Sequence, residues 1–94
     1  MNIQWLEDAV KDLQALRNYI AQDNPIAANR IAERIIESIK NLVDQPNIGR
    51  PGRVFGTREL VVRDTPYIIP YRVKNNIIEI LRVFHGAMQW PENL

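Results

Sequence analysis

Residues 66–84 read PYIIPYRVKNNIIEILRVF, and this stretch decides the fold. The part from Pro66 to Lys74 alternates apolar and polar side chains as a half-buried strand does, and the part from Ile77 to Phe84 reads as a more deeply buried strand. Asn75-Asn76 lies between them, and asparagine tolerates the positive φ values that a tight hairpin turn requires. We therefore predict an antiparallel β-hairpin with its turn at these asparagines.

Pro70 lies inside the first of these strands, where a proline cannot donate a ladder hydrogen bond. We expect the strand to be bulged there, or the nitrogen of Pro70 to face an unpaired position. Upstream, Thr57 to Arg63 reads as another strand, joined to the hairpin through Asp64-Thr65-Pro66. The three segments together predict a three-stranded antiparallel meander.

Residues 7–44 carry helical periodicity with one interruption. Apolar residues at helical spacing predict a helix from Glu7 to Ala21 and a second helix that ends at about Asp44. Asp23-Asn24-Pro25 separates them, with Asn24 as the N-cap and Pro25 at the first helical position. So short a turn predicts an antiparallel helical hairpin. The apolar stripes that we expect to form the core are Ala9, Val10, Leu13, Leu16, Tyr19 and Ile20 in the first helix, and Ala28, Ile31, Ile35, Ile39 and Leu42, widened by Ala32, Ile36 and Val43, in the second.

The N-terminal residues Asn2-Ile3-Gln4-Trp5 read as a strand, so the predicted order is β-α-α-β-β-β, an α+β fold. Ninety-four residues suffice for one core, and we treat residues 1–94 as a single domain. A hydrophobic content of 46% and a charged content of 24% are typical of globular proteins. No apolar stretch approaches the roughly 18 residues that span a bilayer, and no signal peptide is evident. We therefore expect a cytoplasmic protein without a membrane partner.

The charge is distributed unevenly along the chain. Residues 1–45 hold five basic and seven acidic side chains, whereas residues 46–94 hold seven basic and four acidic ones. Most of the positive excess comes from Arg50, Arg53, Arg58 and Arg63. Such a patch suits a phosphate backbone or an acidic partner, and the alternative is an arginine-bearing loop and strand that are simply solvated.

Side chains that could do chemistry are few. With one histidine and no cysteine, the chain lacks the three or four convergent ligands of a zinc site. No glycine-rich loop followed by a lysine is present to bind phosphate groups. We therefore predict no metal, no cofactor and no small-molecule substrate.

What remains is a set of three residues, Arg58, Arg82 and His85. By strand alternation, Arg82 shares a face with Ile80 and Phe84, and His85 lies on the other face. If these three side chains lie close together in the fold, the arginines would stabilise a phosphorane-like transition state while His85 serves as acid or base. The structural alternative is that Arg82 pairs with a glutamate, Glu59 or Glu79, and that His85 caps the edge of the sheet.

Three segments in order resemble the RelE/ParE superfamily of bacterial toxins from type II toxin–antitoxin pairs. They are GTRELVV at residues 56–62, YIIPYRV at residues 67–73, and ILRVFH at residues 80–85, which is followed by Gln89-Trp90-Pro91. The break between the helices and the loop GRPGR at residues 49–53 look like the ParE branch. The resemblance covers essentially the whole chain.

The resemblance implies a small toxin that is neutralised by a cognate antitoxin protein in a hetero-oligomer. RelE-like members cleave messenger RNA on the ribosome, whereas ParE-like members poison DNA gyrase and are not nucleases. The nuclease branch places an arginine directly after the first tyrosine of the Tyr-x-x-x-Tyr segment, where this chain has Ile68. It also carries an arginine or tyrosine set on the last strand and tail, where this chain offers only Arg82 and His85.

We therefore favour gyrase as the target and keep ribosome-dependent messenger RNA cleavage as the alternative. In the alternative, Arg58, Arg82 and His85 would be catalytic. The residues expected to contact the target or the antitoxin are Arg50, Arg53, Arg58, Arg82, His85 and Trp90.

Overall fold

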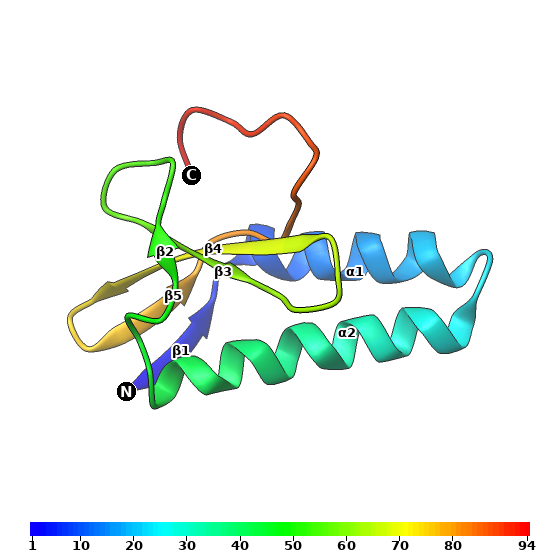
Figure 1. Ribbon diagram of the computed structural model, residues 1–94, viewed down its shortest axis with the longest axis horizontal. Helices are drawn as coiled ribbons and strands as arrows, with labels where there is room; N and C mark the ends of the chain where they lie inside the picture. The colour runs from blue at the N-terminus through cyan, green and yellow to red at the C-terminus, as the bar shows by residue number, and fades with distance from the viewer.

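A helical hairpin packs on a mixed β-sheet in the computed structural model, which describes residues 1–94 (Figure 1). The predicted α+β fold with an N-terminal strand, two helices and then strands is confirmed. Figure 1 shows α2 on one side of the sheet and the C-terminal tail, residues 86–94, on the other. The elements are β1 (Asn2–Trp5), α1 (Glu7–Ala21), α2 (Pro25–Lys40), a 3₁₀ turn η1 (Asn41–Val43), β2 (Arg50–Pro51), β3 (Arg58–Val61), β4 (Tyr67–Lys74), β5 (Ile77–Ile80) and β6 (Phe84–His85).

The helix boundaries follow local sequence signals. The side-chain oxygen of Asn24 accepts a hydrogen bond from the backbone nitrogen of Ala27 at 3.0 Å, and Pro25 opens α2, so the predicted N-cap is confirmed. α2 ends at Lys40, earlier than predicted, and η1 carries the chain onward. Because a 3₁₀ turn continues the helical path in a tighter form, Leu42 is still fully buried. None of the helices is long and apolar enough to cross a bilayer.

The predicted apolar stripes are buried only in part. Val10 and Tyr19 of α1, Ile36 of α2 and Val43 of η1 are exposed, and Tyr19 keeps 73% of its surface accessible. The prediction that these residues belong to the core is wrong. Within these stripes, the side chains that belong to the core cluster are Ala9, Ile35, Ile39 and Leu42.

The strands form one mixed sheet in the order β1-β5-β4-β3-β2, with β6 also paired to β4. The β4–β5 turn lies at Asn75 and Asn76, whose φ values of 53° and 64° confirm the predicted hairpin. β1 runs parallel to β5, with Trp5 opposite Ile80. A parallel pair requires a crossover connection, and here the helical hairpin and the other strands lie between the two strands in the sequence.

A β-bulge interrupts the chain after β5. β5 pairs with β4 as far as Ile80, opposite Tyr71, and β6 resumes the pairing at Phe84, opposite Ile68. Two residues of β4 therefore face the three residues 81–83, which is one residue too many for a regular ladder. The prediction of a single strand from Ile77 to Phe84 is wrong for this reason.

The bulge lies opposite Pro70. The backbone nitrogen of Leu81 donates to the carbonyl oxygen of Pro70 at 3.0 Å, so the ladder uses the one backbone group that proline retains. On its other side, Pro70 stands opposite Glu59 of β3. The expected bulge is therefore at the level of the proline but in the neighbouring strand.

The extra residue changes which side chains share a face of the sheet. Ile78, Ile80 and Val83 all belong to the same buried cluster, although strict alternation would put Val83 on the face opposite Ile80. His85 stands opposite Tyr67, and Tyr67 packs against this cluster. The prediction that His85 lies on the face away from Ile80 is therefore wrong, since the bulge returns it to the face that the helices cover.

The core lies between the helical hairpin and this face of the sheet. The hydroxyl group of Tyr71 lies at the end of this core that meets the loop before β2. There it donates to the carbonyl oxygen of Pro46 at 2.8 Å and accepts from the backbone nitrogen of Gly49 at 2.9 Å. A Cβ atom at Gly49 would lie 2.6 Å from the Tyr71 ring, so only glycine allows this approach. The core cluster comprises Ala9, Ile35, Ile39, Leu42, Val62, Ile69, Tyr71, Ile78, Ile80 and Val83.

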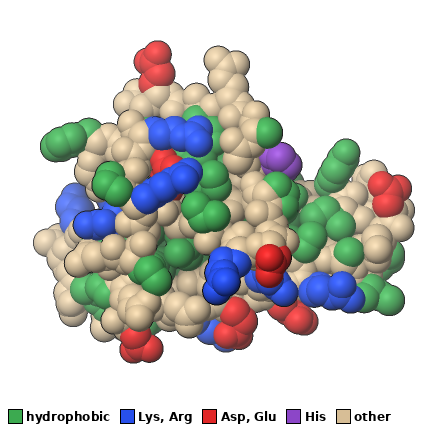
Figure 2. Space-filling view, in the orientation of Figure 1, with side chains coloured by type: hydrophobic (Ala, Val, Ile, Leu, Met, Phe, Trp, Pro, Cys, Tyr) green, Lys and Arg blue, Asp and Glu red, His purple; other side chains and the backbone are tan.

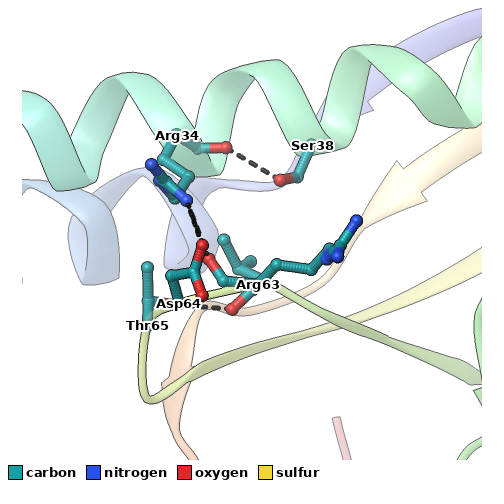
Figure 3. A network of polar contacts seen from close by, with 6 residues as sticks. Arg34, Ser38, Arg63, Asp64 and Thr65 are labelled. Atoms are coloured by element: carbon teal, nitrogen blue, oxygen red, sulfur yellow. Dashed lines mark hydrogen bonds and ion pairs between the residues drawn. The ribbon is translucent and has the colours of Figure 1, made fainter.

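One exposed polar network joins α2 to the β3–β4 connection (Figure 3). The Arg34 guanidinium donates to the side chain of Asp64 at 3.0 Å and to the backbone carbonyl of Arg63 at 3.3 Å. Asp64 adopts a φ of 61°, which turns the chain back toward β4. Figure 3 shows the side chain of Arg63 pointing away from the Arg34–Asp64 pair. Arg63 follows the end of β3, whereas Arg50 stands opposite Glu59 within it, so Arg63 lies apart from Arg50 along the strand.

Candidate functional site

The predicted site residues lie at three places. Arg82 and His85 lie beside α1, at the end of the sheet that contains the bulge and β6. Arg50, Arg53 and Trp90 lie together where the C-terminal tail meets β2. Arg58 lies on β3 and binds the loop before β2.

An open groove of about 360 Å³ runs between α1 and β6, and we call it the α1–β6 groove. In the space-filling view, the only histidine, coloured purple, stands at an indentation of the surface to the right of the tail (Figure 2). Most of the groove lining is apolar. Its residues are Asp12, Ala15, Leu16, Tyr19, Tyr67, Arg82, Val83, Phe84, His85 and Met88.

Arg82 is bound by Asp12 of α1. The guanidinium donates two hydrogen bonds to this carboxylate, from Nε at 2.8 Å and from Nη2 at 3.0 Å. The same carboxylate accepts a third hydrogen bond from the backbone nitrogen of Val83 at 3.0 Å, inside the bulge. The hydrogen bonds to Asp12 raise the pKa of the Arg82 guanidinium further, although burial opposes this effect. The predicted alternative, a pair with Glu59 or Glu79, is wrong because the bulge directs Arg82 toward α1.

His85 is exposed at the edge of the α1–β6 groove. Its Nδ1 atom accepts a hydrogen bond from the backbone nitrogen of Ala87 at 3.1 Å, which puts the proton of the neutral ring on Nε2. The ring meets that of Tyr67 edge-on, with centroids 5.7 Å apart. Burial, and secondarily the nearby Tyr19, raise the pKa of Tyr67 above its ordinary value. Tyr67 is therefore neutral at physiological pH.

Sequence reasoning missed Asp12. A signal was present, because Asp12 lies three residues after Ala9 and four before Leu16, on the stripe that faces the sheet. A carboxylate on such a stripe needs a partner, since burying an unpaired charge is costly. That partner, Arg82, is 70 residues away in the sequence.

The second group lies around Glu59, which is only 2% exposed. Arg50 donates to Oε1 of Glu59 from Nε at 3.1 Å and approaches it from Nη2 at 3.0 Å. The backbone nitrogen of Arg53 donates to Oε2 at 2.8 Å, and its Nε lies 3.7 Å from the same oxygen. The Arg53 guanidinium covers the ring of Trp90 at 3.9 Å, and this ring packs against Phe84. We call Arg50, Arg53, Glu59 and Trp90 the arginine–tryptophan surface.

This surface carries an excess of positive charge. Figure 2 shows Lys and Arg side chains with an acidic side chain between them on the upper left of the molecule. Both Arg50 and Arg53 have about half of their side-chain surface exposed, at 52% and 49%. A single carboxylate cannot neutralise two guanidinium groups, so one positive charge stays available to a partner.

Arg58 does not join either group. Its guanidinium donates to the carbonyl oxygens of Gly49 at 2.9 Å and Asn47 at 3.3 Å. Arg58 stands opposite Tyr71 on β4, whereas His85 stands opposite Tyr67. Four residues of strand separate the two positions, which is about 13 Å. Within the molecule, no group of three or more His, Asp or Glu side chains gathers as a metal site would require.

The helical hairpin and the mixed sheet define a small α+β domain that carries two arginine-bearing surfaces. Residues 3–90 match the family described as the ParE toxin of the type II toxin–antitoxin system parDE. The chain therefore belongs to the ParE toxin family of type II toxin–antitoxin systems, and the resemblance to the RelE/ParE superfamily is confirmed.

Individual relatives agree with this assignment. The chain is 46% identical over 92 residues to the protein named "Putative toxin Y4kP" of Sinorhizobium fredii, and the match covers 98% of this chain and 95% of that protein. It is 39% identical over 85 residues to Toxin RelE2 of Caulobacter vibrioides, covering 90% of this chain and 94% of that protein. A solved structure described as the chromosomal ParDE TA system from P. aeruginosa is similar with a TM-score of 0.83 and 33% identity, over 90% of this chain and 95% of that one.

Proposed function

We propose that this toxin stops growth by binding DNA gyrase and holding the enzyme on cleaved DNA, and that a cognate antitoxin protein neutralises it. The observation that carries the proposal is the pairing of Arg82 with Asp12. A nuclease needs a cation that is free to take up the negative charge developing on the scissile phosphate. In this protein the carboxylate already occupies the guanidinium of Arg82 and neutralises it.

His85 supports the same proposal. A general base must offer a lone pair to the 2′-hydroxyl group of the RNA. In the neutral ring of His85, the lone pair of Nδ1 is taken by the backbone N–H of Ala87, and Nε2 carries the proton. Arg58 lies about 13 Å along the strand from this position, so it cannot replace Arg82 there. A toxin that acts by binding requires none of these groups to transfer a proton.

The comparisons support the antitoxin partner. The family is that of a toxin from a toxin–antitoxin system, and the similar solved structure is described as a ParDE system. By this proposal the functional form is a hetero-oligomer with the antitoxin, and its site of action is the bacterial cytoplasm, where gyrase works. The arginine–tryptophan surface, the α1–β6 groove and Arg58 supply the contacts.

The test is a cleavage assay with purified gyrase, supercoiled plasmid, ATP and increasing amounts of the toxin. We expect linear DNA that stays covalently attached to gyrase, and we expect plasmid incubated with toxin alone to stay supercoiled. The variant His85→Ala serves as the matched control, because it removes the candidate acid–base group from an exposed position. It should trap gyrase at toxin concentrations within about threefold of the parent's, since contacts of this size are worth less than about 1 kcal/mol. A folded toxin that inhibits growth but traps no gyrase would refute the proposal.

The second candidate function is ribosome-dependent cleavage of messenger RNA. It is favoured by one observation, that Tyr67, Arg82 and His85 line the same groove. The measurement is RNA cleavage in a translating extract, with Asp12→Asn as the informative variant because it releases the Arg82 guanidinium. Codon-linked cleavage that increases in Asp12→Asn and disappears in Arg82→Ala would establish the nuclease in place of the gyrase poison.

A further inference from the structure

Phe55, at the tip of the loop between β2 and β3, is fully exposed. Its side chain shows 103% of the reference surface, more than any other large apolar residue of the chain. Exposed aromatic rings forgo the favourable free energy of burial, and they are characteristic anchors of binding surfaces. Phe55 has no neighbour in this structure that would explain its position.

The loop that carries Phe55 is tightly braced. The backbone nitrogen of Gly52 donates to the carbonyl oxygen of Thr57 at 2.8 Å, and the Thr57 hydroxyl donates to the carbonyl oxygen of Val54 at 2.6 Å. A Cβ atom on Gly52 would lie 2.1 Å from the Thr57 hydroxyl oxygen, so glycine is required for the loop to close. The loop therefore presents Phe55 in a fixed position, which lowers the entropic cost of using it as an anchor.

The surroundings of the loop are positively charged. Arg50 and Arg53, at its base, are half exposed and share the single buried carboxylate of Glu59. Arg58, which follows the loop, is held by carbonyl oxygens and has no carboxylate partner. Arg50, Arg53 and Glu59 thus leave an excess of one positive charge beside one projecting aromatic ring.

We propose that this loop contacts duplex DNA, with Phe55 inserted into an opened base step and the guanidinium groups of Arg50 and Arg53 on the flanking phosphates. Apolar wedges flanked by arginines are how proteins unstack base pairs, and the phosphate contacts offset the unstacking. Because the side chain of Phe55 is fully exposed, both faces of its ring are open to bases. An acidic protein surface with an apolar pocket is the competing occupant, and the cross-linking experiment below distinguishes it from DNA.

This inference rests on the proposed function, because gyrase holds the DNA at the strand break. The base step at a break has lost its continuous backbone, so it opens at less cost than an intact step. A ring inserted there would keep the ends apart and oppose their rejoining. Phe55 would then be the group that converts gyrase binding into trapped, cleaved DNA.

The direct experiment is photo-crosslinking in growing cells that express the toxin with p-benzoylphenylalanine in place of Phe55. The matched control carries the same group in place of Ile26, which is 71% exposed on α2, away from the loop. We expect an adduct at position 55 that DNase destroys and RNase does not, and no such adduct at position 26. An adduct to a gyrase subunit at position 55 would overturn the DNA contact and leave the gyrase proposal intact. An RNase-sensitive adduct would overturn both, and the absence of any adduct from cells whose growth is arrested would overturn the DNA contact.

A second measurement separates stacking from burial in a pocket. In the gyrase assay, Phe55→Ala should need about 5- to 100-fold more toxin for half-maximal cleaved DNA, which is the range for the loss of one stacked base. Phe55→Trp should stay near the parent, and Phe55→Leu should fall between the parent and Phe55→Ala, because leucine can wedge into a base step but cannot stack on the bases. Each variant should melt within about 3 °C of the parent, since the side chain makes no contacts in the fold. Full activity of Phe55→Ala, which removes the wedge altogether, would contradict the proposal.

Discussion

Two carboxylates, Asp12 and Glu59, each organise arginine side chains in this protein, and they do so with different results. In the α1–β6 groove, Asp12 binds the one guanidinium of Arg82 through two hydrogen bonds, and the pair is neutral. On the arginine–tryptophan surface, Glu59 is shared by Arg50 and Arg53, and a positive charge remains. The comparison teaches that the number of cations around each carboxylate, and not the presence of arginine, decides which surface can attract an anion.

The largest loss of stability is expected from substitution of Glu59. Glu59→Ala leaves the backbone nitrogen of Arg53 without its acceptor and removes the carboxylate that two guanidinium groups share. We expect a loss of about 2–3 kcal/mol in the free energy of unfolding, below the range for fully buried ion pairs because both arginines can rehydrate. Urea denaturation followed by circular dichroism measures it. The control is Glu79→Ala, whose carboxylate binds the single Arg72. Equal losses for the two variants would show that sharing by two arginines has no special role.

A slightly smaller loss of stability is expected from substitution of Asp12. Asp12→Asn removes the negative charge and one of the two oxygens that accept from Arg82, while the remaining amide oxygen can still accept from the backbone nitrogen of Val83, so we expect a loss of about 2 kcal/mol. In a double-mutant cycle with Arg82→Ala, the double variant should lose less than the sum of the single variants, because both remove the same interaction. Asp8→Asn, at an exposed position of the same helix, should be nearly neutral. Strict additivity of Asp12→Asn and Arg82→Ala would mean that the pair contributes nothing to stability.

The Tyr71 hydroxyl holds the loop that leads into β2, the strand that carries Arg50. Removing this hydroxyl tests how much the loop contributes to stability on the Glu59 side of the molecule. Tyr71→Phe leaves the carbonyl oxygen of Pro46 and the nitrogen of Gly49 without this partner, and we expect a loss of about 1–1.5 kcal/mol at neutral pH. Burial raises the pKa of Tyr71 above its ordinary value of 10.0, partly opposed by the backbone hydrogen bond from Gly49 and by Arg58.

The pH dependence of the stability follows from the raised pKa of Tyr71. A phenol whose pKa is raised by folding contributes stability that is fully present below pH 10 and is lost as the pH rises through the folded-state pKa. Denaturation midpoints between pH 9 and about 11.5 should therefore fall less steeply for Tyr71→Phe than for the parent. The slope should not vanish, because the pKa of Tyr67 is raised as well. Parallel profiles would show that folding does not shift the pKa of Tyr71.

The smallest effect is expected for the exposed pair between Arg34 and Asp64. Asp64 has 84% of its side-chain surface exposed, so solvent screens the pair and we expect Arg34→Ala to cost less than about 1 kcal/mol. The change should shrink further in 1 M NaCl, which distinguishes a screened charge interaction from packing. A loss as large as that of Asp12→Asn would show that burial is not what separates the two kinds of pair.

The sequence alone determined the helices, the main strands and turns, and the family of this protein, but not the short strands β2 and β6. The helices, the Asn24 cap and the Asn75-Asn76 turn depend on residues within a few positions of one another, so their signals can be read along the chain. The order of the strands and the membership of the toxin superfamily followed from the same segments.

Only the tertiary structure decided where the chemistry-bearing side chains point. Strand alternation failed at residues 81–83, because Pro70 in the neighbouring strand meets a bulge there, and one extra residue reverses every face that follows. The partner of Arg82 is Asp12, 70 residues away, and Trp90 packs between Arg53 and Phe84. Such pairings depend on packing across the whole domain and leave no local periodicity, so the neutralised groove and the positively charged surface could be told apart only once the chain was folded.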